Sequence, residues 1–218
     1  MTTLLRLALL VAATIGVAGM APAVHADPTA VRRPVPAFHA IAASGSLDVE
    51  VSIGKQASVE LTADPDTLDA VITRVDGGVL TLGIERDRER AVHAARRPRL
   101  VIVATSLTAL TATGSTTVTA TGVASDRLEL RVHGNGKLVA TGTARALNAR
   151  ISGSGELVAR DLAAGDGTIA VTGSGHVTAR VSGVLDAVAT GSGKIDLIGH
   201  PARISSVVAV GDRAIRFH

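Results

Sequence analysis

Apolar and polar residues alternate along the second half of the chain, and a glycine turn interrupts the alternation at regular intervals. The turn is typified by ISGSGELVAR, residues 151–160. The first glycines of its successive copies are Gly114, Gly134, Gly153, Gly173, Gly191 and Gly211, with spacings of 20, 19, 20, 18 and 20 residues. A steady period near twenty is typical of a solenoid, whose repeats bury their apolar sides by stacking on one another.

Each repeat is expected to contribute two short strands. In one copy Leu157 and Ala159 stand four and six residues after the first glycine, and the matching positions of the other copies are also apolar. The residue between them varies from Thr to Asp and Arg, which indicates an outward position on a strand. A second apolar run precedes each turn, as in 128–132 and 147–151. The sequence therefore predicts an all-β solenoid of about five coils with ~20-residue repeats.

The recurring glycines fit a structural role in this fold. A coil corner reverses the chain within two or three residues, which calls for the positive φ that glycine adopts without a Cβ penalty. The residue between each glycine pair is Ser or Asn, a type that bonds to nearby backbone in turns. We interpret the following as structural turn residues: Gly45, Gly114, Gly134, Gly136, Gly153, Gly155, Gly173, Gly175, Gly191, Gly193 and Gly211.

The chain divides into four segments. Residues 1–26 have one Arg at position 6, an apolar run over 7–19 and small residues at 24 and 26, so they predict a secretory signal peptide cleaved before Asp27. An uncleaved anchor is the alternative, but the run is short against the ~20 residues of a membrane-spanning helix. Residues 27–37 are Pro-rich and expected to be a flexible lead. An N-terminal β part, 38–104, is expected to continue or cap the solenoid repeats of 105–218.

Composition excludes several function classes. The chain has no cysteine, so disulfides, thiolate metal sites and a lipid-modified cysteine are impossible. It has no Trp or Tyr and only two Phe, so no aromatic platform for single-stranded nucleic acid or stacked sugars can form. The formal charge of +3 is too weak to indicate nucleic-acid binding. No other segment is long and apolar enough to span a membrane, so we expect no integral membrane segment after signal cleavage.

The residues also resemble a known family. The stretch from Phe38 to Val49, with its SGSLDV turn, and the tandem turns ATGST, VHGNG, ISGSG, VTGSG and ATGSG are similar to the head GIN domain, described as auto-transporter adhesin-like. The resemblance covers about Phe38 to Ile215. It implies a right-handed parallel β-helix exported to the periplasm or the cell surface, and it offers no catalytic residues. The first and last turns and the charged loop 85–99 depart from the family pattern.

One polar patch is a candidate for catalysis. Lys137, Glu156 and His176 stand three residues after their turn glycines, so stacking would place them on adjacent coils. A single carboxylate is not sufficient to cleave a polysaccharide, because that reaction needs two acids at a fixed separation. We therefore favour a solvated mixed-charge face, while a second acid near His176 would favour an enzyme. No cofactor or metal is predicted, because the repeats lack the recurring Asp of calcium-binding rolls and the histidines are scattered.

The loop 85–99 holds the candidate anion-binding residues. They are Arg86, Arg88, Arg90, Arg96, Arg97 and Arg99. Grouped arginines can bind phosphate or carboxylate groups through forked hydrogen bonds. The alternative, which the sequence favours, is a solvated connection whose charges keep a sheet edge from pairing.

The resulting expectation is a secreted, non-enzymatic binding or adhesion module of the cell envelope, with envelope polysaccharide or a surface protein as its partner. Two alternatives stay open. One is a β-helical enzyme acting on polysaccharide, and the other is a structural protein that self-associates through its ends as a homo-oligomer. An uncovered terminal coil would favour the second alternative.

Overall fold

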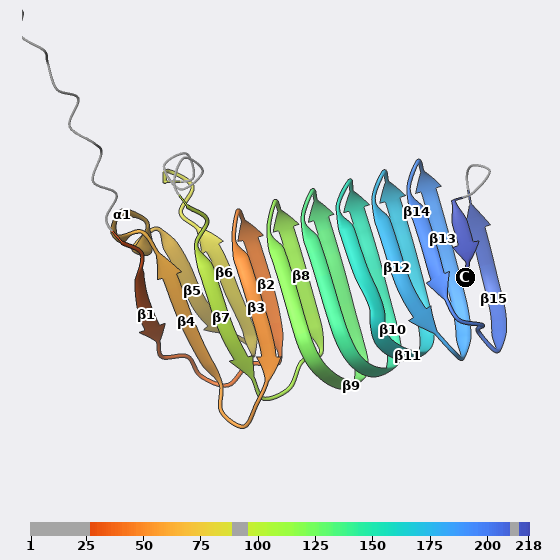
Figure 1. Ribbon diagram of the computed structural model, residues 1–218, viewed down its shortest axis with the longest axis horizontal. Coiled ribbons are helices and arrows are strands. Elements are labelled where there is room, and N and C mark those ends of the chain that lie inside the picture. Colours follow the sequence, from red (N-terminus) through yellow and green to blue (C-terminus); the bar gives the residue numbers. More distant parts are fainter. Residues whose placement is uncertain (1–26, 89–95, 210–213) are drawn as a thin grey trace, which may run out of the picture.

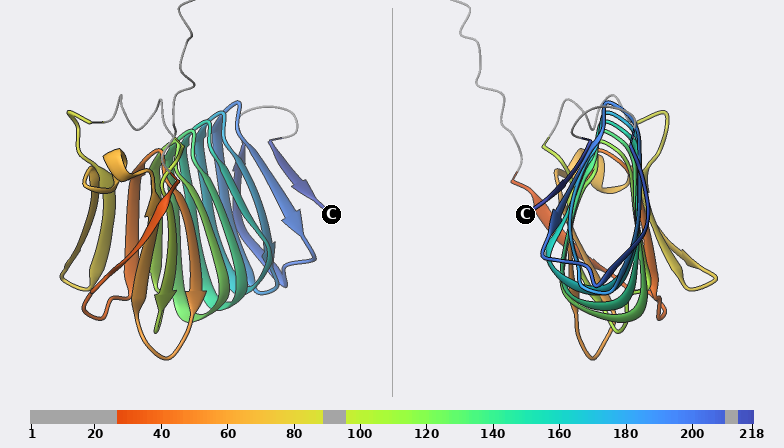
Figure 2. Two further views of the ribbon diagram at one scale, coloured as in Figure 1. Left: turned by 60° about the vertical axis from the view of Figure 1, so that its left-hand side comes forward. Right: turned by 90° about the vertical axis from the view of Figure 1, so that its right-hand side faces the viewer.

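The computed structural model describes residues 27–88, 96–209 and 214–218, and most of them lie in strands. The strands wind into coils that stack along one long axis (Figure 1). Viewed along that axis, the coils form a flattened ring (Figure 2). The predicted all-β solenoid is therefore confirmed. In the described part of the chain, no helix is long and apolar enough to span a membrane.

Two faces make up the solenoid. The pre-turn face consists of the strands that run into the glycine turns: β5 (Val71–Asp76), β6 (Val79–Ile84), β2 (Ala40–Gly45), β8 (Ala109–Gly114), the second halves of β9 (Thr117–Gly134), β10 (Lys137–Gly153) and β11 (Glu156–Gly173), then β13 (Val184–Gly191) and β15 (Arg203–Ala209). The post-turn face consists of the strands that leave them: β1 (Thr29–Arg33), β4 (Ser58–Ala63), β7 (Arg99–Ala104), β3 (Asp48–Ile53), the first halves of β9, β10 and β11, then β12 (His176–Val181), β14 (Lys194–Ile198) and β16 (Ile215–Phe217).

Parallel pairing keeps equivalent repeat positions side by side. Leu138 lies beside Val118 on one strand and beside Leu157 on the next, and all three side chains are buried. Alternate residues of each strand point into the ring, where they form one continuous core. The small Ala140 and Ala159 fill the next inward position, which suits the narrow interior. The apolar columns predicted from the sequence are thus the core of the molecule.

The glycine turns lie on one corner, along the upper edge in Figure 1. Gly153 has a φ of +124°, and a Cβ there would lie 2.6 Å from the carbonyl oxygen of Gly134 on the preceding coil. Gly155 has no positive φ, but a Cβ on it would lie 2.6 Å from the carbonyl oxygen of Gly136. Crowding between coils, besides backbone conformation, therefore calls for glycine here. Gly211 lies outside the described residues.

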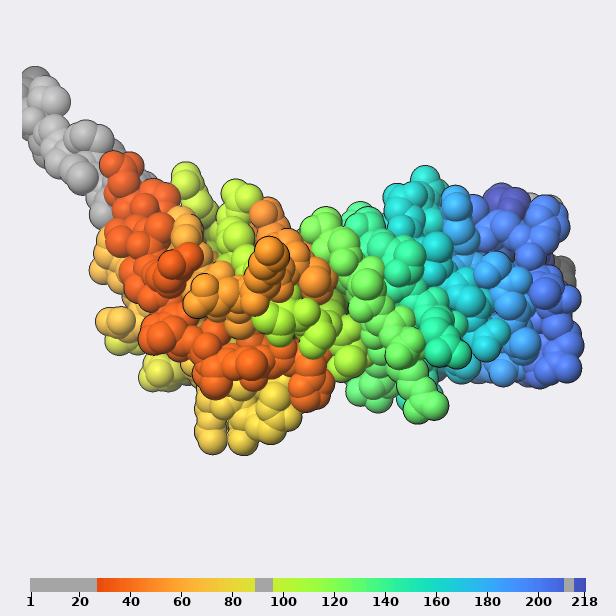
Figure 3. Space-filling model, turned by 90° about the horizontal axis from the view of Figure 1, so that it is seen from below, coloured from red at the N-terminus to blue at the C-terminus, as the bar shows by residue number. Residues whose placement is uncertain are grey.

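The N-terminal part continues the stack and then closes it. Strand β3 pairs in parallel with both β9 and β7, and β4 and β1 add to that face in antiparallel orientation. On the other face β6 pairs with β2, and β5 folds back on β6 as a hairpin. A one-turn helix, α1 (Pro65–Leu68), lies between the faces, and the whole part is broader than the repeats (Figure 3).

The segment 27–37 differs from the expectation of a flexible lead, because Thr29–Arg33 form β1. Its backbone pairs with the free edge of β4, and Arg33 anchors it to the opposite face. The Arg33 guanidinium donates to the carbonyl oxygens of Leu68 (2.8 Å) and Val71 and to the hydroxyl of Thr73 (3.1 Å). The neighbouring prolines obscured this short strand in the sequence. The signal-peptide prediction, 1–26, falls outside the described residues.

Candidate functional site

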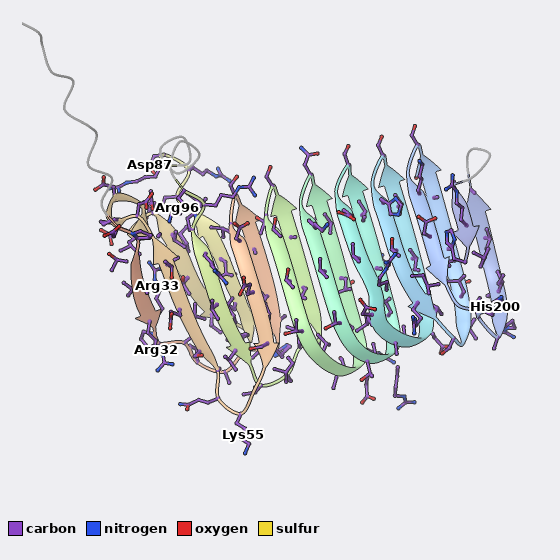
Figure 4. The ribbon with its side chains drawn as sticks, viewed as in Figure 1. Arg32, Arg33, Lys55, Asp87, Arg96 and His200 are labelled. Atoms are coloured by element: carbon purple, nitrogen blue, oxygen red, sulfur yellow. The ribbon has the colours of Figure 1, made fainter. Side chains whose placement is uncertain are left out.

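The arginines of the loop 85–99 do not share one environment. Arg86, Arg88 and Arg96 are exposed at the N-terminal end, and Figure 4 shows Arg96 there near Asp87. Arg88 contacts the backbone oxygen of Asp66 at 3.5 Å, the limit of a hydrogen bond. Arg90 lies outside the described residues. Arg86, Arg88 and Arg96 are thus exposed enough to bind an anion.

Arg97 and Arg99 instead pair with acidic residues of β3. Arg99 donates to both carboxylate oxygens of Glu50, at 2.7 and 2.9 Å, and this hydrogen bond raises the pKa of Arg99 above its ordinary value. Arg97 lies 3.8 Å from a carboxylate oxygen of Asp48 and donates to the backbone oxygen of Ser115 at 3.3 Å. These two arginines therefore pair with acidic side chains of the neighbouring strand.

On the post-turn face, the residues of the predicted polar patch pair with other partners than expected. Lys137, Glu156 and His176 lie in register on adjacent strands, as predicted. The Lys137 ammonium lies 2.8 Å from the Glu156 carboxylate, whereas His176 contacts Asp196 at 2.9 Å. The other oxygen of Asp196 lies 3.3 Å from His218. Asp196 was not among the predicted patch residues, although its position between the apolar Ile195 and Leu197 marks it as outward.

The second acid that would favour an enzyme is therefore present beside His176, yet the setting does not suit glycoside cleavage. That reaction needs two carboxyl groups facing one sugar-sized cleft. Glu156 and Asp196 are each held by basic partners on an even strand face, and neither lines the grooves described for this surface. Among the described residues, no group of three His, Asp or Glu side chains could hold a metal ion.

The pre-turn face carries a pair of arginines that sequence reasoning missed. Arg131 of β9 and Arg150 of β10 lie directly side by side in the parallel register. Arg131 pairs with Glu129 of its own strand, whereas Arg150 is exposed and has no ion pair within the described chain. Like charges opposite one another destabilise a sheet, unless an anion lies between them. Both residues stand three positions before a turn glycine, so aligning that column would have revealed the pair.

A groove of about 780 Å³ lies next to this pair, where the coils bend from the post-turn to the pre-turn face. Leu128 and Leu147 line it together with Glu129, Asn148 and Thr168. Those three polar residues occupy one column on adjacent strands, beside the arginine column. The Asn148 side-chain oxygen is shielded from water and accepts no hydrogen bond in the structure. A buried acceptor without a hydrogen-bond donor lowers the stability of a folded protein by about 1–3 kcal/mol. If the Asn148 amide rotated so that its oxygen accepted a hydrogen bond from a ligand, this loss would be recovered.

Hydroxyl groups extend the polar surface on the other side of the arginines. The next outward column toward the turns contains Ser44, Thr113, His133, Ser152, Thr172 and Thr190. We call the arginine pair, its two neighbouring columns and the groove the pre-turn site. It combines two guanidinium groups, an amide, several hydroxyls and His133 on a rigid sheet, together with the Glu129 carboxylate that pairs with Arg131. Arg150 is the guanidinium without an ion pair in the described chain, and with the hydroxyls it can bind an acidic, hydroxyl-rich polymer.

Comparison with known proteins identifies relatives of this fold. A protein-family model described as "Putative auto-transporter adhesin, head GIN domain" matches residues 37–201. A solved structure described as a "putative adhesin" from Bacteroides fragilis has a TM-score of 0.71 and 18% sequence identity, over 88% of this chain and 97% of that chain.

Two further solved structures resemble the chain. One, described as a "putative lipid binding protein" from Parabacteroides distasonis, has a TM-score of 0.53 and 20% identity, over 88% of this chain and 97% of that chain. A "putative adhesin" from Parabacteroides merdae has a TM-score of 0.57 and 17% identity, over 88% and 96%. A search of curated proteins found no significant match. Because the family model spans most of the described repeats and the N-terminal β part, the chain belongs to the head GIN domain family.

Proposed function

We propose that this protein is an exported, non-enzymatic binding module of the bacterial cell envelope, and that its pre-turn site binds acidic polysaccharide. The observation that carries this proposal is the arginine pair. Arg131 and Arg150 are held side by side on adjacent strands, and Arg150 has no ion pair within the described chain. A carboxylate or phosphate group between them would relieve their repulsion and accept forked hydrogen bonds from both.

The surrounding surface suits a sugar polymer. Ser152 and Thr172 offer hydroxyls on successive coils, and Asn148 offers an amide that can donate and accept. Neighbouring strands lie ~4.8 Å apart along the axis, so equivalent groups recur at a fixed spacing that a repeating chain can follow. The strands are fixed by their ladders before the ligand arrives, which reduces the entropy cost of binding.

Three observations support the location and the absence of catalysis. The N-terminal sequence has the composition of a signal peptide, and the family description is that of an adhesin. The two acids of the post-turn patch are each held by a neighbour: Glu156 pairs with Lys137, and Asp196 contacts His176. A periplasmic or surface binding protein is the function that these features favour.

The test uses polygalacturonate and its neutral methyl ester as matched ligands for the purified protein. We expect the acid polymer to bind, the ester to bind more weakly, and added salt to weaken the acid polymer's binding. Arg150→Gln should reduce affinity about tenfold, because a hydrogen bond to a charged group contributes about 1.5–3 kcal/mol. Arg180→Gln, which removes an exposed arginine from β12 on the other face, should leave binding unchanged.

The loop 85–99 needs its own variant, because its exposed arginines could bind the same polymer. Replacement of Arg86, Arg88 and Arg96 by Gln tests that contribution. Loss of binding in this variant with retention in Arg150→Gln would move the site to the loop. Equal binding by the wild type and both variants would overturn the proposal that arginines recognise the ligand.

A further inference from the structure

The C-terminal coil ends the stack with open backbone edges. Within the described residues, β15 pairs with β13 alone and β16 pairs with β14 alone. Every residue of β15 is exposed, unlike those of any other strand on the pre-turn face. This coil forms the blue end of the molecule in Figures 1 and 2.

The same coil leaves the end of the core uncovered. Ile204 and Val207 of β15 continue the inward columns of Leu185 and Ala187, and Phe217 of β16 continues that of Leu197. In the preceding coil Leu185, Ala187 and Leu197 are 0–1% exposed. Ile204, Val207 and Phe217 are 49%, 43% and 46% exposed. These residues face solvent because no further described coil stacks on them.

The edge of β15 has few of the features that usually prevent strand addition, and its pairing with β13 contains one bulge, at Ser205. Its sequence, RISSVVA, carries one charge at its first residue and no proline. The opposite end has two edge strands: β1 carries Arg32 and Arg33, with Pro28 and Pro34 on either side, and β5 on the same face as β15 carries Arg74 and Asp76. Charges and prolines on an edge strand block pairing with other chains. The chain therefore protects its N-terminal edge and leaves its C-terminal edge available.

The interface between coils indicates what fits this surface. Each interior coil meets the next through apolar columns and a row of backbone hydrogen bonds, and the last coil presents the same kind of surface. The N-terminal end presents a lead strand, β1, and the outer strand of a hairpin, β5, both with charged residues, so it does not repeat the surface between interior coils. A second C-terminal coil does match, and its strands would run antiparallel to the first, a pairing that backbone geometry allows.

We propose that the C-terminal coil is the contact surface of a tail-to-tail dimer of this protein. In this dimer β15 lies antiparallel to β15 of the second copy, which places Arg203 opposite the uncharged end of that strand. The contact is two-fold symmetric and closes with two copies, so it does not extend into a fibre.

The first experiment measures the mass of the purified protein by sedimentation velocity over a concentration series. We expect the wild type to shift from monomer to dimer as concentration rises. Val207→Lys places a charge in the contact and should raise the dissociation constant at least tenfold. Val31→Lys is the matched control, because Val31 is 40% exposed on the opposite edge strand, and it should behave as the wild type.

A second measurement does not depend on the folding of Val207→Lys. The chain has no cysteine, so Ser206→Cys in the middle of β15 can form a disulfide only between two copies. We expect a cross-linked dimer under mild oxidation, and Ser58→Cys on β4 should give none. A wild type that stays monomeric throughout the series, or a dimer unaffected by Val207→Lys and not cross-linked by Ser206→Cys, would overturn the proposal. The outcome is independent of polysaccharide binding, which the Arg150 variant tests on a different coil.

Discussion

The two ends of the solenoid differ in whether the end of the apolar core is covered. At the N-terminal end, residues outside the repeat cover the core: β1 extends one face, β5 extends the other, and Arg33 joins them through three hydrogen bonds. In the last described coil, by contrast, the apolar residues Ile204, Val207 and Phe217 are exposed. The difference shows that a repeat supplies its own lateral packing but not its termination, which needs additional sequence.

The largest expected contrast is between the interior and the open end. Leu157→Ala should lower the free energy of unfolding by about 2–5 kcal/mol, because Leu157 is fully buried and its loss leaves a cavity. Ile204→Ala should cost less than about 1 kcal/mol, because half of that side chain already contacts water. Urea unfolding of both variants, at dilutions that prevent self-association, measures the two values. Equal losses would mean that Ile204 is covered in solution.

The closure of the N-terminal end is tested next. Arg33→Met keeps much of the side chain's apolar length but removes its hydrogen bonds to Leu68, Val71 and Thr73, so we expect a loss of about 1–3 kcal/mol. Arg32→Met removes the adjacent exposed arginine, whose side chain makes no hydrogen bond to the described residues, and serves as the control. Guanidinium unfolding midpoints compare the two. Identical midpoints would show that β1 alone closes this end.

The smallest effect is expected at the last ion pairs. Asp196→Asn weakens the contacts to His176 and His218 and should cost less than about 1 kcal/mol, because these side chains are partly exposed. Asp186→Asn on β13, an outward acid without an ion pair in the described structure, is the control. Thermal unfolding and hydrogen exchange at Phe217 report the change. A loss above 2 kcal/mol would show that Asp196 holds the C-terminal coil far more firmly than its exposure indicates.

The repeat could be predicted because every coil shows the same physical constraint. The columns of Leu138 and Ala140 recur with the turn glycines, so period and alternation together indicate stacked strands. Closure could not be predicted in this way, because β1 occurs once, beside prolines, and its position depends on the distant contacts of Arg33. A unique segment offers no second copy against which to align it.

The candidate site was predictable in part for the same reason. The grouped arginines of the loop 85–99 predicted an anion site there, yet in the structure Arg97 pairs with Asp48 and Arg99 pairs with Glu50. The pairing of Arg131 with Arg150 depends on register between coils, and that register is encoded in their shared distance from the turn glycines. Local charge density was therefore a weaker guide than position within the repeat. The acids that neutralise Arg97 and Arg99 are separated from them by about fifty residues and become neighbours only through stacking.

The stacking of glycine on glycine also constrains how the molecule can change in length. A Cβ at Gly153 or Gly173 would meet the carbonyl oxygen of the glycine one coil earlier, so this corner does not accept a larger residue, whereas coils of 18 to 20 residues between the turns keep the glycines stacked. A whole repeat can be added or removed without disturbing this stacking, because the glycine column and the apolar columns stay aligned. Duplication of one coil would lengthen the pre-turn face by ~4.8 Å while both ends stay unchanged. The reach of the protein can thus evolve in discrete steps, separately from the chemistry at its ends.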